Sequence, residues 1–297
     1  MKAAAFDYVR AESLPQSLEL LAQHGGDAKL LAGGQSLVPM MAMRLLRPAL
    51  LVDIHRLVEL KAIRRDAKTV TIGAGVRQRT LEDDAELPAQ LPLVVKALRW
   101  VGHAQTRNRG TLGGSLVHAD PSAELPLAAL VLDATLRLSS HGGSGRSVKT
   151  AEFFLGPMLS ATAETECLTA IEWPVWQGKG VGAAFDEVAI RHGDFALASA
   201  CAQAQVDGGG ICRRLSFGAG GVDGVPRAFP QIAQGLVGKR LEQGIARDAA
   251  VQAAKTCDPG NDPHASAEYR RHLATVLIER VLLEAAQSAA DSARSAT

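Results

Sequence analysis

The sequence predicts an α+β protein of two domains. Three observations lead to this prediction. At 297 residues the chain is about twice the ~150 residues of an ordinary domain. Segments of helical periodicity and segments of strand periodicity occur along the whole chain. A glycine-rich stretch at 176–185 separates two parts that differ in pattern, which places a domain boundary near residue 176.

Residues 1–55 have the pattern of a small α/β unit. The segment SLPQSLELLAQHGG predicts a helix that is capped by Ser13 and stopped by its two glycines. Short strands are expected at 28–31 and 49–54, and the segment PMMAMRL between them predicts a second helix. We expect this unit to be the first of two subdomains.

The second subdomain, about 56–175, combines strands with helices. An alternating pattern with a polar turn predicts a hairpin over 58–76. The stretch 80–101 is helical in pattern but is broken by two prolines, and a glycine-rich segment follows at 107–126. An apolar run, a loop and a strand pair then lead to Pro174. The first domain therefore covers 1–175.

The second domain, 176–290, has strands first and a helix last. Two strands flank the turn at 207–210, as in a hairpin. Residues 264–286 repeat apolar positions at helical spacing, with Arg and Glu on the other face. The end of the chain is rich in Ala and Ser, so we expect residues 291–297 to be a frayed tail.

Composition excludes several classes of protein. Lys and Arg number 32 against 31 Asp and Glu, so a net charge of +1 offers no global field for nucleic acid. The four cysteines form no C-x-x-C pair, which argues against zinc and against an iron–sulfur cluster in this chain. No secretory apolar region precedes them, so we expect reduced thiols in the cytoplasm. The longest apolar runs are too short for a transmembrane segment.

Two Gly-Gly segments are candidate phosphate-binding loops. AGGQS at 32–36 lies between a predicted strand and a predicted helix, and TLGGS at 111–115 repeats the pattern with a hydroxyl group at each end. Adjacent glycines let backbone N–H groups approach an anion closely, and a helix that starts just after them adds a partial positive charge. Two such loops can clamp one extended ligand. The same residues also fit ordinary tight turns, and the pattern alone leaves both interpretations open.

The common catalytic and nucleotide motifs are absent from the sequence. Neither segment supplies G-x-G-x-x-G, no lysine has a Walker A frame, and neither H-E-x-x-H nor G-x-S-x-G occurs. A plain Rossmann dehydrogenase and a P-loop enzyme are therefore disfavoured. His118 follows the second segment, but a lone histidine beside a glycine loop is more often a surface residue than a base. We predict no catalytic side chain and no metal ligand.

In their longer forms, AGGQSLVPMMAMRLLRP and TLGGSLVHADPSAELP, the two segments resemble the FAD-binding medium subunit of the molybdenum hydroxylases, the carbon monoxide dehydrogenase and xanthine dehydrogenase family. The segment FDEVAIRHGDFALASA, 185–200, is similar to that family's aromatic-x-x-x-x-x-R-x-G-D-aromatic segment. HASAEYRRHLATVLIERVL, 264–282, is similar to the family's closing helix. The four segments occur in the family's order and span nearly the whole chain.

The resemblance implies a vanillyl-alcohol-oxidase-like FAD fold of two subdomains, followed by a C-terminal α+β domain that covers the flavin. It also implies the cofactor contacts. Both glycine segments hold the FAD pyrophosphate, an acidic residue ten positions after the second Gly-Gly pair holds the ribose, and a leucine and an aromatic residue approach the flavin ring. In this sequence these residues are Ala32, Gly33, Gly34, Gln35, Ser36, Leu37, Thr111, Gly113, Gly114, Ser115, Glu124, Leu168 and Phe195. Family members often carry Asn in place of Ser115 and Asp in place of Glu124.

The function that the resemblance implies is that of an electron-transfer subunit. In the family a large subunit with molybdopterin converts the substrate, a small subunit with two [2Fe–2S] clusters passes electrons on, and the FAD of the medium subunit delivers them to an acceptor. We expect a dimer of such heterotrimers. Two alternatives stay open: a free-standing FAD-dependent oxidase or dehydrogenase, and a scaffold subunit that has lost its flavin.

Overall fold

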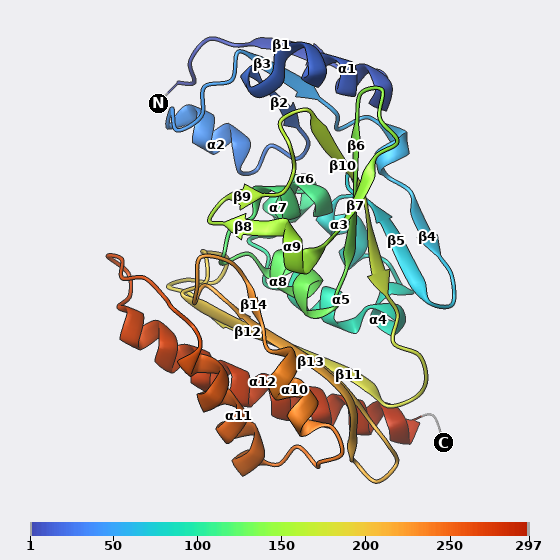
Figure 1. The fold of residues 1–297 in the computed structure, drawn as a ribbon, viewed down its shortest axis with the longest axis vertical. Coiled ribbons are helices and arrows are strands. Elements are labelled where there is room, and N and C mark those ends of the chain that lie inside the picture. The colour runs from blue at the N-terminus through green and yellow to red at the C-terminus, as the bar shows by residue number, and fades with distance from the viewer. Residues whose placement is uncertain (1, 296–297) are drawn as a thin grey trace.

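The computed structural model describes residues 2–295. Figure 1 shows three main sheets arranged one after another along the longest axis of the molecule, with the N-terminal sheet at one end and the C-terminal helices at the other. The sequence prediction of an α+β protein is confirmed.

The first sheet is small and parallel. It has the strand order β1-β3-β2 and is built from β1 (Asp7–Arg10), β2 (Ala28–Leu31) and β3 (Leu50–Asp53). Helix α1 (Leu14–His24) packs on one face and begins at Ser13, whose hydroxyl oxygen accepts a hydrogen bond from the Gln16 amide at 3.3 Å. The predicted α/β unit is confirmed, although the sequence analysis missed β1.

The second sheet is antiparallel and has five strands. In spatial order they are β4 (Ile63–Arg65), β5 (Thr69–Gly73), β10 (Glu166–Pro174), β6 (Thr135–Ser140) and β7 (Arg146–Lys149). Six short helices share its hydrophobic core: α3 (Gln78–Glu82), α4 (Leu87–Gln90), α5 (Pro92–Leu98), α7 (Leu112–His118), α8 (Glu124–Val131) and α9 (Thr150–Phe153). Helix α6 (Ala104–Arg109) lies between α5 and α7 in the chain and contacts α3. A small hairpin of β8 (Phe154–Gly156) and β9 (Leu159–Ser160) follows α9. The predicted hairpin over 58–76 is confirmed as β4 and β5.

The third sheet is antiparallel and lies between two sets of helices. Its strands, in order, are β11 (Val181–Val188), β12 (Ala198–Val206), β13 (Cys212–Gly220) and β14 (Arg227–Ala228). One face is rich in alanine and shares a core with α10 (Pro230–Leu236), α11 (Gln243–Lys255) and α12 (Ala267–Ser295). The other face packs against α5 and α8, two helices that accompany the second sheet, as Figure 1 shows. The hairpin predicted around 207–210 is confirmed.

The second glycine segment is not a loop, which corrects the sequence prediction. Gly113, Gly114 and Ser115 lie in the first turn of α7. Thr111 has extended backbone angles, and its hydroxyl oxygen accepts a hydrogen bond from the Gly114 amide at 3.1 Å. This is an N-cap, and it starts the helix despite the low helix propensity of two glycines.

Half of the predicted linker at 176–185 belongs to a strand instead. Val181 begins β11, and two glycines of this stretch are required by packing. A Cβ on Gly180 would overlap the carbonyl oxygen of Val206, and a Cβ on Gly182 would overlap the backbone of Ala289. Glycine content therefore marks close contact between elements here rather than flexibility.

The predicted frayed tail is also corrected. Helix α12 continues to Ser295, well past the expected limit, and residues 296–297 lie outside the described part of the chain. Ala285 and Ala289, just before the predicted tail, are fully buried against the third sheet, whereas residues 291–294 are helical but mostly exposed. Alanine also has the highest helix propensity, which favours this extension.

Candidate cofactor site

The first glycine segment lies at the carboxyl edge of the parallel sheet. It leaves β2 at Leu31, which pairs with Asp53 at the end of β3, and it leads into α2 (Leu37–Ala42). Gly34 has a φ of +73°, a conformation that glycine adopts without strain. The carboxyl edge of parallel strands is where open α/β sheets bind ligands. The predicted residues Ala32 to Leu37 therefore occupy a favourable place for an anion.

Backbone donors are available in this segment. The amides of Gly33, Gly34, Gln35 and Ser36 make no hydrogen bond to another described residue, and the side-chain amide of Gln35 donates to the carbonyl oxygen of Gly33 at 3.2 Å. Several N–H groups in one turn form a concave site that suits a phosphate oxygen. These amides are the strongest anion donors of the two glycine segments.

The second glycine segment offers different donors. Its backbone amides are already used: Leu112 donates to Val76, Gly113 to Ala74, Gly114 to the Thr111 hydroxyl oxygen, and Ser115 to the Thr111 carbonyl oxygen, at 2.8–3.2 Å. The hydroxyl hydrogens of Thr111 and Ser115 remain as donors, and Gly114 is exposed between them. Contact with a phosphate at this segment would therefore come from hydroxyl groups rather than from the backbone.

The structure brings the two glycine segments together. A Cβ on Gly33 would overlap the carbonyl oxygen of Arg109 and would lie 2.9 Å from the Cα of Gly110. Gly113 is equally constrained, because its Cβ would overlap that of Ala74. The first segment thus packs against the residues that directly precede the second segment, and this contact requires a glycine at position 33.

Glu124, the predicted ribose contact, is the first residue of α8 and is half-buried. Burial, assisted by the nearby carboxylate of Asp120, raises the pKa of Glu124 to about 7. The side chain therefore changes charge near neutral pH. Asp120 itself is buried and accepts a hydrogen bond from the Ser122 amide at 2.9 Å.

Sequence reasoning missed Glu187, which lies opposite α8 on β11. Its side chain is only 6% exposed, and its Oε2 atom has no hydrogen-bond partner among the described residues. Burial, followed by the charges of Glu124 and Asp186, raises the pKa of Glu187 to about 8. The spacing in the sequence could have revealed that Glu187 is buried. It follows Phe185 by two residues in a strand, so the two side chains point to the same buried face.

The two predicted ring contacts lie in contrasting environments. Leu168 is buried at a bulge of β10, where its side chain belongs to the core of the second unit. Phe195 follows β11 and is 73% exposed. An aromatic ring left in solvent beside the junction of two units is free to cover a planar ligand.

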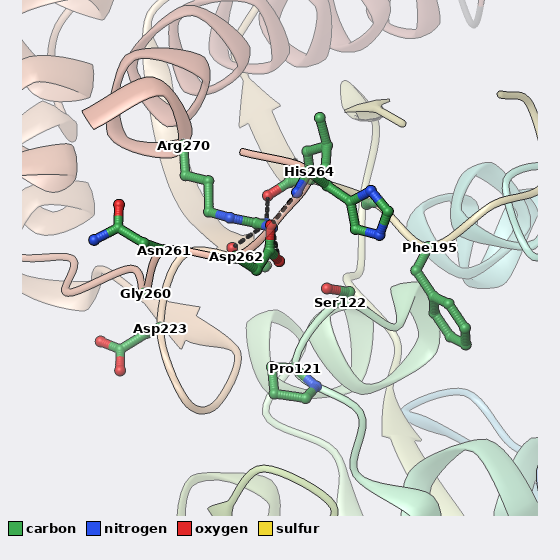
Figure 2. Close-up of a pocket in the computed structure, with 12 residues that line it drawn as sticks. Pro121, Ser122, Phe195, Asp223, Gly260, Asn261, Asp262, His264 and Arg270 are labelled. Carbon is green, nitrogen blue, oxygen red and sulfur yellow. Dashed lines mark hydrogen bonds and ion pairs between the residues drawn. The ribbon is translucent and has the colours of Figure 1, made fainter. Parts of the chain in front are cut away.

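A pocket of about 270 Å³ adjoins Phe195 at this junction. Figure 2 shows the ion pair of Asp262 and Arg270 in its upper part, with Pro121 and Ser122 below. Arg270 is buried and donates to the carbonyl oxygen of Leu197 and to Asp262, each at 2.5 Å. The pocket thus has both apolar and polar lining residues, and Arg270 is held in place by its bonds to Leu197 and Asp262.

These features fit a bound FAD. Free amides at the sheet edge suit its pyrophosphate, and a hydroxyl-bearing helix start lies beside them. The unpartnered Oε2 of Glu187 can form a hydrogen bond with a polar ligand. Within residues 2–295, no group of three His, Cys, Asp or Glu side chains is placed to hold a metal ion, and no helix is long and apolar enough to span a bilayer.

Comparison with known proteins agrees with this geometry. Residues 4–176 match the family described as the FAD binding domain in molybdopterin dehydrogenase, and residues 183–285 match the CO dehydrogenase flavoprotein C-terminal domain. The 6-hydroxypseudooxynicotine dehydrogenase complex subunit alpha of Paenarthrobacter nicotinovorans is 38% identical over 96% of both chains. The carbon monoxide dehydrogenase medium chain of Hydrogenophaga pseudoflava is 33% identical over 93% of this chain and 96% of that one. A crystal structure of quinoline 2-oxidoreductase from Pseudomonas putida 86 superposes with a TM-score of 0.92 at 36% identity and covers 98% of this chain and all of that chain.

Proposed function

Because this chain belongs to the FAD-binding subunits of the molybdenum hydroxylases, we propose that it passes electrons from [2Fe–2S] clusters of a partner subunit, through FAD, to an external acceptor. One structural observation supports the proposal in addition to family membership. The free amides of the first glycine segment lie at the edge where the second segment meets it, which is the arrangement that a dinucleotide pyrophosphate requires.

The cofactor supplies the redox chemistry when it is bound, and the protein supplies its position and surroundings. In our proposal the amides of 33–36 and the hydroxyl groups of Thr111 and Ser115 bind the pyrophosphate. Glu124 accepts hydrogen bonds from the ribose. The backbone at Leu168 and the ring of Phe195 would contact the flavin ring. No side chain of this set acts as a nucleophile.

The proposal also assigns a separate role to each domain. Residues 1–175 would hold FAD, and residues 176–290 would cover it. The buried contact of α8 with the third sheet supports this arrangement, because it fixes Glu124 and Glu187 on facing surfaces. The Gly221 amide also donates to the carbonyl oxygen of Pro121 at 2.8 Å, which ties the loop after β13 to the turn before α8.

The cysteines support the proposal that the clusters belong to another chain. Cys167, Cys201, Cys212 and Cys257 are all buried and unpaired, and they are spread over three separate cores. Burial raises the pKa of Cys167 to about 12 and that of Cys257 to about 11, so neither is poised to become a thiolate ligand. We propose an iron–sulfur small subunit and a molybdopterin large subunit as partners, assembled as a dimer of heterotrimers in the cytoplasm.

A free-standing FAD-dependent oxidase or dehydrogenase is the second candidate. The pocket of about 270 Å³ beside Phe195 favours it, because this volume suits a small substrate. Native mass spectrometry of the complex from its own host separates the candidates. We expect two further subunits together with iron and molybdenum. A fully active homomer that contains FAD but neither metal would contradict the subunit proposal, and a complex without flavin would indicate a scaffold.

A further inference from the structure

Two arginines lie beside the proposed pyrophosphate site. The backbone of Arg109 touches the first glycine segment, since its carbonyl oxygen is the atom that a Cβ on Gly33 would overlap. Arg109 also ends α6, two residues before Thr111. Arg77 directly precedes α3 and pairs with Thr111 in an isolated antiparallel bridge. Each arginine is therefore next to a residue that the proposed function assigns to the pyrophosphate.

The bridge determines where the side chain of Arg77 begins. Backbone hydrogen bonds of 2.9 and 3.0 Å join the residues on either side of Arg77 to those on either side of Thr111. This pattern defines a non-hydrogen-bonded antiparallel pair, in which the two Cα atoms are about 4.5 Å apart. Side chains of such a pair leave the backbone on the same side. The side chains of Arg77 and Thr111 therefore begin side by side.

Neither arginine has an acidic partner. Both side chains are exposed, and neither forms an ion pair or a hydrogen bond with another residue of 2–295. The arginines two positions away differ, because Glu82 pairs with Arg79 at 3.2 Å and with Arg107 at 3.1 Å. The carboxylate of Glu82 thus compensates these two charges and leaves Arg77 and Arg109 available to an anion.

The charge of the two arginines suits the ligand. The free amides of 33–36 can donate hydrogen bonds but carry no formal charge. Asp53, at the same sheet edge, already accepts a hydrogen bond from Tyr8 at 2.5 Å and lies 2.9 Å from the ring of His55. A dinucleotide pyrophosphate carries two negative charges, which two guanidinium groups can balance through charge-assisted hydrogen bonds. The chain thus places two uncompensated positive charges at this site although its net charge is only +1.

We propose that Arg77 and Arg109 bind the pyrophosphate of FAD and attract the anionic cofactor to the flavin-free protein. This inference rests on the proposed function. The amides of 33–36 fix the positions of the phosphate oxygens, and the two guanidinium groups close on them from solvent. Because these side chains are exposed, salt screens their attraction, with a Debye length of about 10 Å at 0.1 M. The affinity for FAD therefore decreases as the ionic strength rises.

The test is a fluorescence titration of the flavin-free complex with FAD at low and at high salt concentration. Arg77→Gln and Arg109→Gln should each raise the Kd about three- to tenfold at low salt, and less at high salt. The double variant should lose most of the salt dependence. The matched control is Arg247→Gln on α11, which removes the charge of another exposed arginine and should leave the Kd unchanged.

Competition experiments show which part of the cofactor the arginines contact. ADP carries a pyrophosphate without the flavin ring, so it should compete with FAD more weakly in both glutamine variants than in the wild type. Adenosine carries no phosphate and should compete equally well in all of them. A loss of competition by adenosine that matches the loss by ADP would contradict a contact with the pyrophosphate.

The remaining outcomes separate this inference from the proposed function. A Kd and a salt dependence that stay unchanged in both glutamine variants would overturn the role of the arginines and leave the proposed function intact. An equal loss of affinity in Arg247→Gln would also overturn it, because the effect would then come from net charge. A wild-type complex that binds no FAD at any salt concentration would overturn the proposed function.

Lysine variants provide the second test, also if a glutamine variant does not fold. Arg77→Lys and Arg109→Lys keep the positive charge but lose the planar fork of the guanidinium group. Both should retain the salt dependence of FAD binding. Lysine variants whose affinity no longer responds to salt would contradict the proposal.

Discussion

Gly33 lies directly against the backbone of Arg109. A Cβ at Gly33 would overlap the Arg109 carbonyl oxygen, so the first glycine segment can pack against the residues that precede the second segment only because Gly33 has no side chain. The sequence pattern suggested that the glycine leaves room for a phosphate. The structure shows that it leaves room for the protein's own backbone.

Replacing Gly33 by alanine should therefore affect both stability and flavin binding. We expect the free energy of unfolding to fall by about 1–3 kcal/mol, the usual cost of overpacking, and FAD to be lost from the purified protein. Chemical denaturation and the ratio of flavin to protein measure the two effects. Gly208→Ala is the control, because a Cβ at Gly208 meets no atom within 4 Å. Wild-type stability and full flavin content in Gly33→Ala would show that the two segments separate at little cost.

Glu124→Ala should weaken FAD binding by about 1.5–3 kcal/mol, the net value of a hydrogen bond to a charged acceptor. Because the pKa of Glu124 is about 7, its carboxylate form and hence its value as an acceptor should increase as pH rises through 7. Fluorescence titration of the flavin-free complex with FAD at several pH values measures this. If the dissociation constant does not change, the neighbouring Asp120 becomes the candidate for the ribose contact, and Asp120→Asn tests it.

The two glutamates with raised pKa values should make the flavin-free chain less stable at high pH. Glu124 and Glu187 have pKa values of about 7 and about 8 in the folded chain, above the 4.5 of an exposed glutamate. Between these values the folded state binds more protons than the unfolded state does. The free energy of unfolding is therefore highest below pH 4.5 and decreases as the pH rises to about 8. Denaturation across this range should show the decline.

The Glu187 contribution to this decline can be isolated. In Glu187→Gln the decline should be smaller by at least ~1 kcal/mol, since one pKa unit is worth about 1.4 kcal/mol and the group is buried. A variant whose stability falls with pH as steeply as that of the wild type would show that Glu187 is not protonated in the folded chain.

Phe195→Ala should leave the fold intact and change the flavin. The side chain is 73% exposed, so we expect the free energy of unfolding to shift by less than ~0.5 kcal/mol. Loss of an aromatic contact should weaken FAD binding by about 0.5–1.5 kcal/mol and alter flavin fluorescence. Val58→Ala, at a residue that is 76% exposed, serves as the control. Unchanged affinity and fluorescence in Phe195→Ala would remove this residue from the cofactor site.

Local patterns account for the parts of the fold that the sequence predicted. The cap at Ser13, the hairpin of β4 and β5 and the hairpin around 207–210 depend on neighbouring residues, and all three are present. Two of the errors concern elements whose stability comes from distant contacts. The strand that begins at Val181 and the last turns of α12 pack on each other, and neither has a local signal strong enough to reveal it.

The sequence by itself determined the membership of the family, the two glycine segments and the absence of clustered cysteines, because these are properties of residue order and spacing. Only the tertiary structure decided that Gly33 meets Arg109, that the amides of the second segment are already occupied, and that Glu187 lies unpartnered beside Ser199 and opposite Glu124. The physical reason is that most of these relationships join residues that are far apart in the chain, such as Gly33 and Arg109 or Gly113 and Ala74. Close packing and hydrogen-bond satisfaction are set by the atoms that folding brings together, and no local pattern encodes them.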